Sequence, residues 1–174
     1  MYKLDYPSPI GVVEIVGTSE GILSILFTER DKPLYAREST TPKVLEDAYS
    51  ELNEYFRGER QTFTFPCIVA GTAFQQKVWE TLKGIPFGVT ASYKDIAVSM
   101  GNDKAIRAVG SANGKNKLSI VIPCHRIIGS NGKLTGYAGG LWRKEWLLLH
   151  EKNLCPLKVE SRTKENGKNI EQEK

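Results

Sequence analysis

Cysteine and histidine are scarce in this sequence, with three cysteines and two histidines among 174 residues. Cys67, Cys124 and Cys155 form no C-x-x-C pair, and their number and spacing argue against a disulfide framework. A zinc site made of these cysteines and His125 is an open alternative, but it would lack the usual ligand spacing. We therefore expect no metal.

Long apolar runs are absent as well. No stretch approaches the roughly 20 apolar residues that cross a membrane, and residues 1–7 lack the apolar segment of a signal peptide. The composition, 40% hydrophobic and 25% charged, is that of an ordinary soluble protein, and the length suits one domain or two small ones. We expect a cytoplasmic protein, nuclear in a eukaryote, with no membrane partner.

Positive charge is concentrated in one part of the chain. Residues 73–152 carry 12 Lys and Arg against 5 Asp and Glu, whereas residues 1–72 carry 7 against 11. This asymmetry is expected if a polyanion docks on the basic part and the acidic part serves as scaffold. A solvated, lysine-rich surface would give the same counts.

The most informative stretch runs from Ser119 to Gly129. Branched apolar residues at 119–122 predict a short buried strand, which Pro123 should end because it removes a backbone donor and fixes φ. A cysteine, a histidine and an arginine then follow in succession. A base and a positive charge next to a thiol favour the reactive thiolate. The alternative is an inert core cysteine, since free cysteines are often buried.

Residues 1–71 predict a small α/β scaffold followed by a linker from residue 58. Apolar, β-rich runs predict strands at 2–6, 10–16 and 22–27, the last two joined as a hairpin. Apolar residues at helical spacing predict a helix that begins near Pro42 and ends at Gly58.

Residues 72–154 predict a mainly helical domain. A capping box at Thr72 starts a first helix. Ser92 caps a second helix, and after a turn at 101–102 a third helix covers residues 103–112. Two short helices joined by a glycine turn are a helix-turn-helix pattern, which is typical of DNA-binding proteins.

The third predicted helix carries Arg107 among small residues such as Ala108 and Gly110. Small side chains let a helix approach a groove closely, and a long cation could then reach into the duplex. Packing inside a core is the alternative reason for small residues.

The end of the chain predicts a loop, a helix and a tail. Residues 136–140 are too glycine-rich for a regular element and should form a loop near the cysteine. Apolar residues at helical spacing resume at Leu141, and Glu151 lies at the end of that helix. Residues 155–174 are polar and charged, which predicts a disordered tail.

Pro123-Cys124-His125-Arg126 resembles the active-site signature of the 6-O-alkylguanine-DNA alkyltransferases, the methylated-DNA-protein-cysteine methyltransferases. Further segments resemble the family in the same order: Phe74-Gln-Gln-Lys-Val-Trp79, Ser92-Tyr93, Arg107-Ala-Val-Gly110, Asn116, Gly136-Tyr-Ala-Gly-Gly-Leu141 and Lys144 to Glu151. The resemblance implies an α/β (α+β) protein. It would have a small ribonuclease-H-like N-terminal domain and a mainly helical C-terminal domain with a winged-helix-like helix-turn-helix.

The resemblance also implies a reaction and a set of site residues. An alkyl group would pass irreversibly from the 6-oxygen of guanine in double-stranded DNA to Cys124, with the 4-oxygen of thymine as an alternative donor. A monomer would act once, without a cofactor. The implied residues are Cys124, His125, Glu151 and Tyr93 for catalysis, with Glu151 as the partner that orients His125; Asn116, Ile127, Tyr137, Ala138 and Lys144 for the extruded base; and Ser92, Arg107, Ala108, Gly110 and Arg126 for DNA.

Two readings from other classes stay open at this point. One is a DNA-binding regulator whose helix pair reads sites and whose cysteine is incidental. The other is a cysteine hydrolase built on Cys124, His125 and Glu151. Stoichiometry separates the three readings, because they require one alkyl group per chain, none, or many turnovers.

Overall fold

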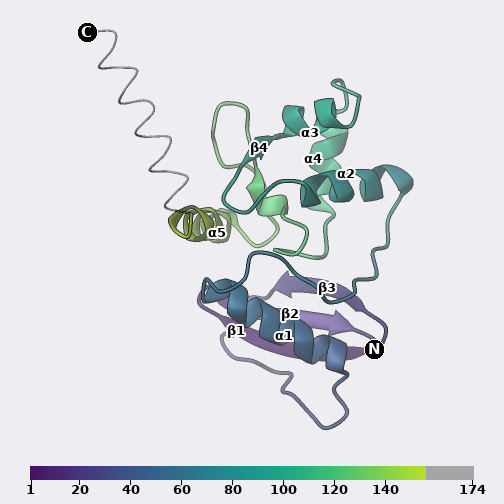
Figure 1. Ribbon diagram of the computed structural model, residues 1–174, viewed down its shortest axis with the longest axis vertical. Coiled ribbons are helices and arrows are strands. Elements are labelled where there is room, and N and C mark those ends of the chain that lie inside the picture. The colour runs from purple at the N-terminus through teal and green to yellow at the C-terminus, as the bar shows by residue number, and fades with distance from the viewer. Residues whose placement is uncertain (156–174) are drawn as a thin grey trace, which may run out of the picture.

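The N-terminal part of the molecule is a three-stranded antiparallel sheet covered by one helix. The computed structural model describes residues 1–155. The strands are β1 (Tyr2–Ser8), β2 (Gly11–Gly17) and β3 (Ile22–Phe27), in the order β1-β2-β3. Helix α1 (Lys43–Phe56) lies across one face of this sheet (Figure 1). The predicted strands, hairpin and helix are confirmed. Of the tail predicted for residues 155–174, only Cys155 is described, and it is half-buried with its thiol at the Phe87 carbonyl; residues 156–174 lie outside the described residues.

Apolar side chains from the sheet and from α1 form the core of this part. Val13 and Ile15 of β2 and Leu45 and Leu52 of α1 are all 0% exposed. Each buried side chain of this size contributes about 1.5–3 kcal/mol. Leu52→Ala would cost about 2–5 kcal/mol, because the close-packed surroundings collapse only partly into the space it leaves.

The rest of the described chain is mainly helical. Its elements are α2 (Ala73–Lys83), β4 (Ala91–Ser92), α3 (Tyr93–Ser99), α4 (Ile106–Gly114), the 3-10 turn η1 (Cys124–Arg126), β5 (Ile127–Ile128) and α5 (Leu141–Asn153). Helices α2, α3 and α4 gather away from the sheet, and α5 lies beside the boundary between the two parts (Figure 1). Strands β4 and β5 pair in parallel. No helix within residues 1–155 is both long and apolar enough to cross a membrane.

Local sequence signals account for the starts of α2 and α3. Thr72 and Ser92 each accept a hydrogen bond from the backbone three residues on, and the side chain at that third position returns the bond. Both capping boxes satisfy backbone amides that a helix start leaves without partners. The third predicted helix begins at Ile106 instead of residue 103, because the Ala105 amide donates to the Asn102 carbonyl and closes a turn first.

The strand predicted at 119–122 is wrong, because this segment is a tight turn. The Val121 amide donates to the Ser119 carbonyl at 2.8 Å, and the Ile122 amide donates to the Leu118 carbonyl at 2.9 Å. Ile120 has a φ of 73°, a left-handed conformation that costs a β-branched residue free energy. Cys124 therefore follows a strained turn and does not end a strand.

Backbone hydrogen bonds attach this turn to the N-terminal sheet. The Ile25 amide donates to the Lys117 carbonyl at 2.8 Å, and the Ser119 amide donates to the Ile25 carbonyl at 3.0 Å. The linker joins the same edge of β3 through an isolated bridge between Ile22 and Cys67. The edge of β3 that does not face β2 is thus paired with both the linker and the segment that leads to Cys124.

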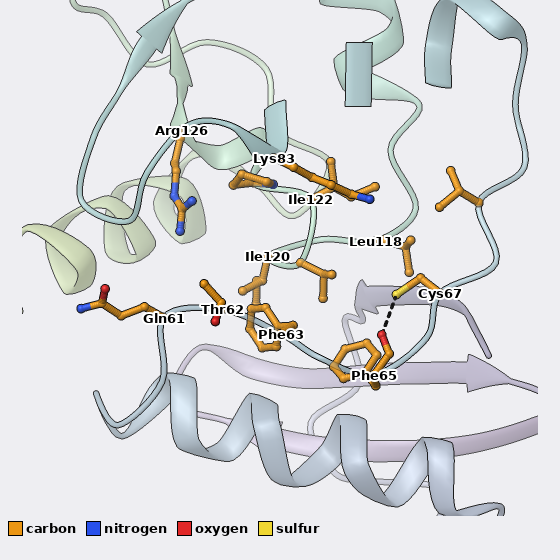
Figure 2. Close-up of a pocket in the computed structure, with 13 residues that line it drawn as sticks. Gln61, Thr62, Phe63, Phe65, Cys67, Lys83, Leu118, Ile120, Ile122 and Arg126 are labelled. Atoms are coloured by element: carbon orange, nitrogen blue, oxygen red, sulfur yellow. Dashed lines mark hydrogen bonds between the residues drawn. The ribbon is translucent and has the colours of Figure 1, made fainter. Parts of the chain in front are cut away.

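Between the linker and the turn lies a cavity of about 350 Å³, drawn in Figure 2. Phe63 and Phe65 line it from the linker, and Ile120 and Ile122 line it from the turn. The residues directly before Cys124 are therefore not packed tightly on this side.

Candidate active site

The turn that precedes Cys124 is held by one buried side chain, Asn116. Its amide nitrogen donates to the Ile122 carbonyl at 2.9 Å, and its carbonyl oxygen accepts from the Leu118 amide at 2.9 Å. Cys124 then opens η1 and is 5% exposed. Pro123 was expected to end a strand, but the backbone before it is already a turn, so it lies between that turn and η1. Asn116, which the resemblance assigned to the extruded base, has both ends of its side chain engaged in shaping the turn.

His125 follows Cys124 and is completely buried. Its Nε2 lies 2.7 Å from Oε1 of Glu151. A carboxylate only accepts hydrogen bonds, so Nε2 carries the proton and Nδ1 has a free lone pair. Nδ1 is buried and without a hydrogen-bond partner among residues 1–155. The expected pairing of Glu151 with His125 is present, and it leaves Nδ1 ready to accept a proton.

Arg126 does not lie where the resemblance placed it. It is 6% exposed, its Nε and one terminal nitrogen donate to Glu151 at 2.9 Å each, and its other terminal nitrogen donates to the Ile85 carbonyl at 2.7 Å. Figure 2 shows the guanidinium at one end of the cavity, beside α5. A DNA contact is the wrong expectation for Arg126, because the buried carboxylate occupies its donors.

Burial sets the resting protonation of Cys124 and His125. It raises the pKa of Cys124, although the Asn116 amide and the Lys144 charge act in the opposite direction. It lowers the pKa of His125 despite the Glu151 carboxylate. The resting pair is therefore a neutral thiol and a neutral imidazole. Burial would also raise the pKa of Glu151, but His125 and Arg126 hold that pKa well below its usual range.

Lys144 supplies the positive charge nearest to this thiol from α5. It is 0% exposed, and its Nζ donates to the Thr135 carbonyl at 2.7 Å. Burial lowers its pKa to about 8, while Cys124 opposes the shift. A lysine in this place stabilises a thiolate once the thiol loses its proton.

The glycine-rich segment lies next to the cysteine, as the sequence predicted. The Tyr137 hydroxyl is buried without a hydrogen-bond partner among the described residues, and burial followed by the nearby Cys124 raises its pKa well above the ordinary value. Ala138 is exposed. Ile127, which the resemblance assigned to the extruded base, is 0% exposed, pairs with Ala91 and belongs to the hydrophobic core.

Tyr93 faces the same loop from the start of α3. Its hydroxyl lies 2.8 Å from the Thr135 hydroxyl. Gly110 of α4 lies close to its ring, since a Cβ there would be 3.7 Å from Tyr93 Cδ1. Thr135, which the sequence did not single out, therefore meets both Tyr93 and Lys144.

Arg143 is a second residue that sequence reasoning missed. It is 4% exposed, and its guanidinium donates to the Ile10 carbonyl at 2.8 Å and to the Gly139 carbonyl at 2.9 Å. It thereby ties the glycine-rich loop to the turn between β1 and β2. An arginine in the first turn of a helix gave no signal for this role.

Helix α4 presents an exposed face at the end of the molecule away from the sheet. Arg107 and Ala108 are exposed, and Gly110 is half-buried beneath them. Ser92 caps α3 by accepting from the Asp95 amide at 3.0 Å. Of the residues expected at DNA, these four lie on or beside the helix pair, and Arg126 does not.

Taken together, the geometry supports nucleophilic chemistry by a thiol with a neighbouring base. His125 can accept the thiol proton, Glu151 stabilises the resulting imidazolium, and Lys144 stabilises the thiolate. Within residues 1–155, no group of three or more His, Cys, Asp or Glu side chains is placed to hold a metal ion.

Comparison with known families divides the chain at the linker. Residues 1–67 match the ribonuclease-like domain of 6-O-methylguanine DNA methyltransferase, and residues 73–153 match the DNA binding domain of the same enzyme. The chain belongs to this family. The resemblance seen in the sequence and the mixed α/β organisation are thereby confirmed.

Individual family members cover nearly the whole chain. It is 44% identical over 150 residues to the methylated-DNA–protein-cysteine methyltransferase of Methanosarcina acetivorans, spanning 85% of this chain and 96% of that one. Identity to the constitutive enzyme of Bacillus subtilis is 44% over 143 residues, 79% of this chain and 87% of that one.

Crystal structures of a family member share the fold. The O6-methylguanine methyltransferase of Mycobacterium tuberculosis superposes with a TM-score of 0.78 at 40% identity, covering 89% of this chain and 94% of that one. The structure of the M. tuberculosis OGT in complex with DNA gives a TM-score of 0.79 at 40% identity, covering 88% and 94%.

Proposed function

We propose that this protein repairs DNA by transferring an alkyl group from the 6-oxygen of guanine to the sulfur of Cys124. The observation that carries the proposal is the buried Cys124 next in sequence to His125, which is hydrogen-bonded to the buried Glu151, inside a fold whose family members are named for this reaction. The 4-oxygen of thymine is an alternative alkyl donor of the same chemistry.

The reaction begins with loss of the Cys124 proton. Nδ1 of His125 takes it through a water molecule, since this nitrogen holds the free lone pair. The imidazolium that forms lies 2.7 Å from Glu151, whose buried negative charge stabilises it. The thiolate then attacks the alkyl carbon in line: the S–C bond forms and the C–O bond breaks.

The electron pair of the broken bond stays on the guanine, which needs a proton. Tyr93 gives that proton, and its phenol is already held at the active-site loop by Thr135. Tyr137 and Ala138 line the pocket for the base, with Lys144 behind them. Asn116 acts indirectly, by fixing the turn that presents Cys124.

A guanine stacked in a duplex cannot reach a cysteine that is 5% exposed. The nucleotide must therefore leave the stack, at a cost of a few kcal/mol. Arg107, exposed on α4 beside the small Ala108, fills the gap that the base leaves. The groups of the site all come from one chain, so a monomer suffices.

The product is a thioether, which has no electrophilic carbonyl for water to attack. Each chain therefore reacts once, and this separates the proposal from the two alternatives. A cysteine hydrolase would turn over many times, and a DNA-binding regulator would take up no alkyl group.

Intact-mass analysis after mixing with duplex DNA that carries 6-O-methylguanine tests the proposal. We expect a gain of one methyl group per chain, located by peptide mapping at Cys124. Cys124→Ala should gain nothing yet still bind the alkylated duplex. A protein of unchanged mass, or one that releases methanol repeatedly, would reject it.

The other two cysteines provide matched controls. Burial raises the pKa of Cys67 to about 11, and its thiol donates to the Phe65 carbonyl at 3.8 Å and not to a base, so it should stay unreactive. Cys67→Ala and Cys155→Ala should each accept one methyl group, as the unaltered protein does.

A further inference from the structure

The carboxylate of Glu151 has donors from both parts of the molecule. His125 and Arg126 donate from η1, and the Gly88 amide donates at 3.3 Å. A further donor is the Tyr55 hydroxyl of α1, 2.8 Å from Oε1. Tyr55 belongs to the helix that covers the N-terminal sheet, and it stands 96 positions before Glu151 in the chain.

The position of the Tyr55 phenol is fixed by its surroundings. The residue is 0% exposed, and its ring packs edge-on against Phe56 and Phe87. Its backbone carbonyl lies 2.8 Å from Nε2 of His150, the residue next to Glu151. Two consecutive residues of α5 are thus held by the two ends of one tyrosine.

Tyr55 and His125 meet at the same carboxylate oxygen. His125 Nε2 lies 2.7 Å from Oε1, and the Tyr55 hydroxyl lies 2.8 Å from it. Burial, followed by the Glu151 charge, raises the pKa of Tyr55 well above its ordinary value, so the phenol stays a donor. A donor on Oε1 draws negative charge away from the bond to His125.

We propose that Tyr55 is a positioning residue for the transfer reaction: through Oε1 of Glu151 it aligns His125 and restrains its basicity. The N-terminal domain would then contribute directly to the active site instead of serving only as a scaffold. This inference rests on the proposed function, because it assumes that His125 accepts the thiol proton.

The remaining charged and titratable groups that act on His125 come from η1 and α5. Arg126 and Glu151 bond within the network, Lys144 approaches from α5, and the Cys124 thiol is adjacent in the chain. α1 contributes Tyr55 and no charge to Glu151. Loss of the phenol would leave more negative charge on Oε1 and would favour the protonated imidazole.

Tyr55→Phe tests the inference, because it keeps the ring and removes the donor. The chain has two histidines, so the nitrogen-15 imidazole spectrum is simple enough to follow His125 during a pH titration. We expect the pKa of His125 to rise by roughly half a pH unit. The acid limb of the rate of transfer from free 6-O-benzylguanine should move to higher pH by the same amount, with DNA binding unchanged.

Tyr6→Phe is the matched control. Tyr6 is also a buried tyrosine of the N-terminal domain, and its hydroxyl donates to Asn53 Oδ1 at 3.1 Å, away from Glu151. This variant should leave the His125 titration and the pH profile as they are.

Two results would overturn the inference. One is a His125 pKa in Tyr55→Phe that stays or falls. The other is a rate reduced equally at every pH together with a lower melting temperature, which would mean that Tyr55 serves packing alone. Failure of the unaltered protein to take up an alkyl group would reject the proposed function instead, and the imidazole titration would still report on the Tyr55 contact.

Discussion

Two buried carboxylates, one in each half of the molecule, have similar surroundings and different consequences. Asp5 of β1 accepts two hydrogen bonds from Arg30, at 2.7 and 2.8 Å, and further bonds from the Leu34 and Tyr35 amides. Glu151 of α5 also accepts two bonds from an arginine. The side chains of both are almost fully buried, at 0% and 1% exposure.

The difference lies in what else each carboxylate touches. The partners of Asp5 all lie within residues 1–42, and none of them is a base, so the cluster only holds the loop after β3 in place. The Glu151 carboxylate is hydrogen-bonded both to His125 of η1 and to Tyr55 of α1. His125 in turn follows the buried Cys124 in the sequence. An arginine-carboxylate pair marks a reactive site only where a titratable group connects it to a nucleophile.

Neutralising each carboxylate should give the largest difference between the two clusters, in the rate of transfer. Glu151→Gln leaves Arg126 buried without its anion, which costs about 3–5 kcal/mol, and it should slow transfer about 100-fold or more because His125 loses its partner. Asp5→Asn should lower stability while the folded fraction transfers at the normal rate. Urea unfolding measures the change in stability, and single-turnover kinetics measures the rate of transfer. Equal rate losses in the two variants would show that the two clusters do not differ in function.

Alkylation of Cys124 should disturb only the Glu151 cluster. A methyl group added to the buried Cys124 thiol must push its neighbours apart, which costs about 1–3 kcal/mol, so the melting temperature of the methylated protein should fall. Hydrogen exchange locates the effect: the Gly88 amide, which donates to Glu151, should exchange faster. The Leu34 and Tyr35 amides at Asp5 should keep their protection. A melting temperature that stays the same or rises would contradict this.

The stability of the Glu151 cluster should also respond to acid. The pKa of His125 is lowered by burial from its ordinary 6.5, so below pH 6.5 the unfolded chain binds a proton that the folded chain does not. Stability should therefore fall as pH drops, by up to about 1.4 kcal/mol per pH unit for this proton. Between pH 6.5 and 5, His125→Gln should flatten the curve of unfolding free energy, and an equal slope in both proteins would refute the assignment.

The smallest effect on stability is expected on the exposed face of α4. Arg107 is exposed, so Arg107→Ala should leave the urea midpoint unchanged. It should slow transfer from duplex DNA about tenfold or more, because an extruded base then leaves an unfilled gap. Transfer from free 6-O-benzylguanine needs no extrusion and should keep its rate. Equal slowing on both substrates would mean that Arg107 supports the fold.

Sequence signals predicted best where the structure depends on neighbours in the chain. The hairpin, the capping box at Thr72, the cap at Ser92 and the helix ending near Glu151 all follow from local spacing. The pairing of His125 with Glu151 came from the family resemblance, and the distance of 2.7 Å agrees with it.

The predictions failed where contacts between residues far apart in the sequence override local conformational preference. Residues 119–122 have the composition of a strand, but Asn116 and the edge of β3 hold them in a turn that puts Ile120 at positive φ. Arg126 was expected at DNA from the family resemblance, and only the fold reveals that Glu151 lies beside it. Tyr55 was visible as a phenol within an apolar stripe, which calls for a buried partner, but nothing local identified that partner.

The pairing along β3 also has a consequence for how the protein is made. During synthesis the edge of β3 is completed only when residues 117–119 follow, and the Ile10 carbonyl receives its bond from Arg143 only 133 positions later. Ser119 follows its β3 partner Ile25 by 94 positions, and at about 5–20 residues per second that separation takes roughly 5 to 19 s. For that time the nascent chain carries an unpaired strand edge, a surface on which other chains can pair. The stage most exposed to aggregation therefore falls before α5 has been synthesised.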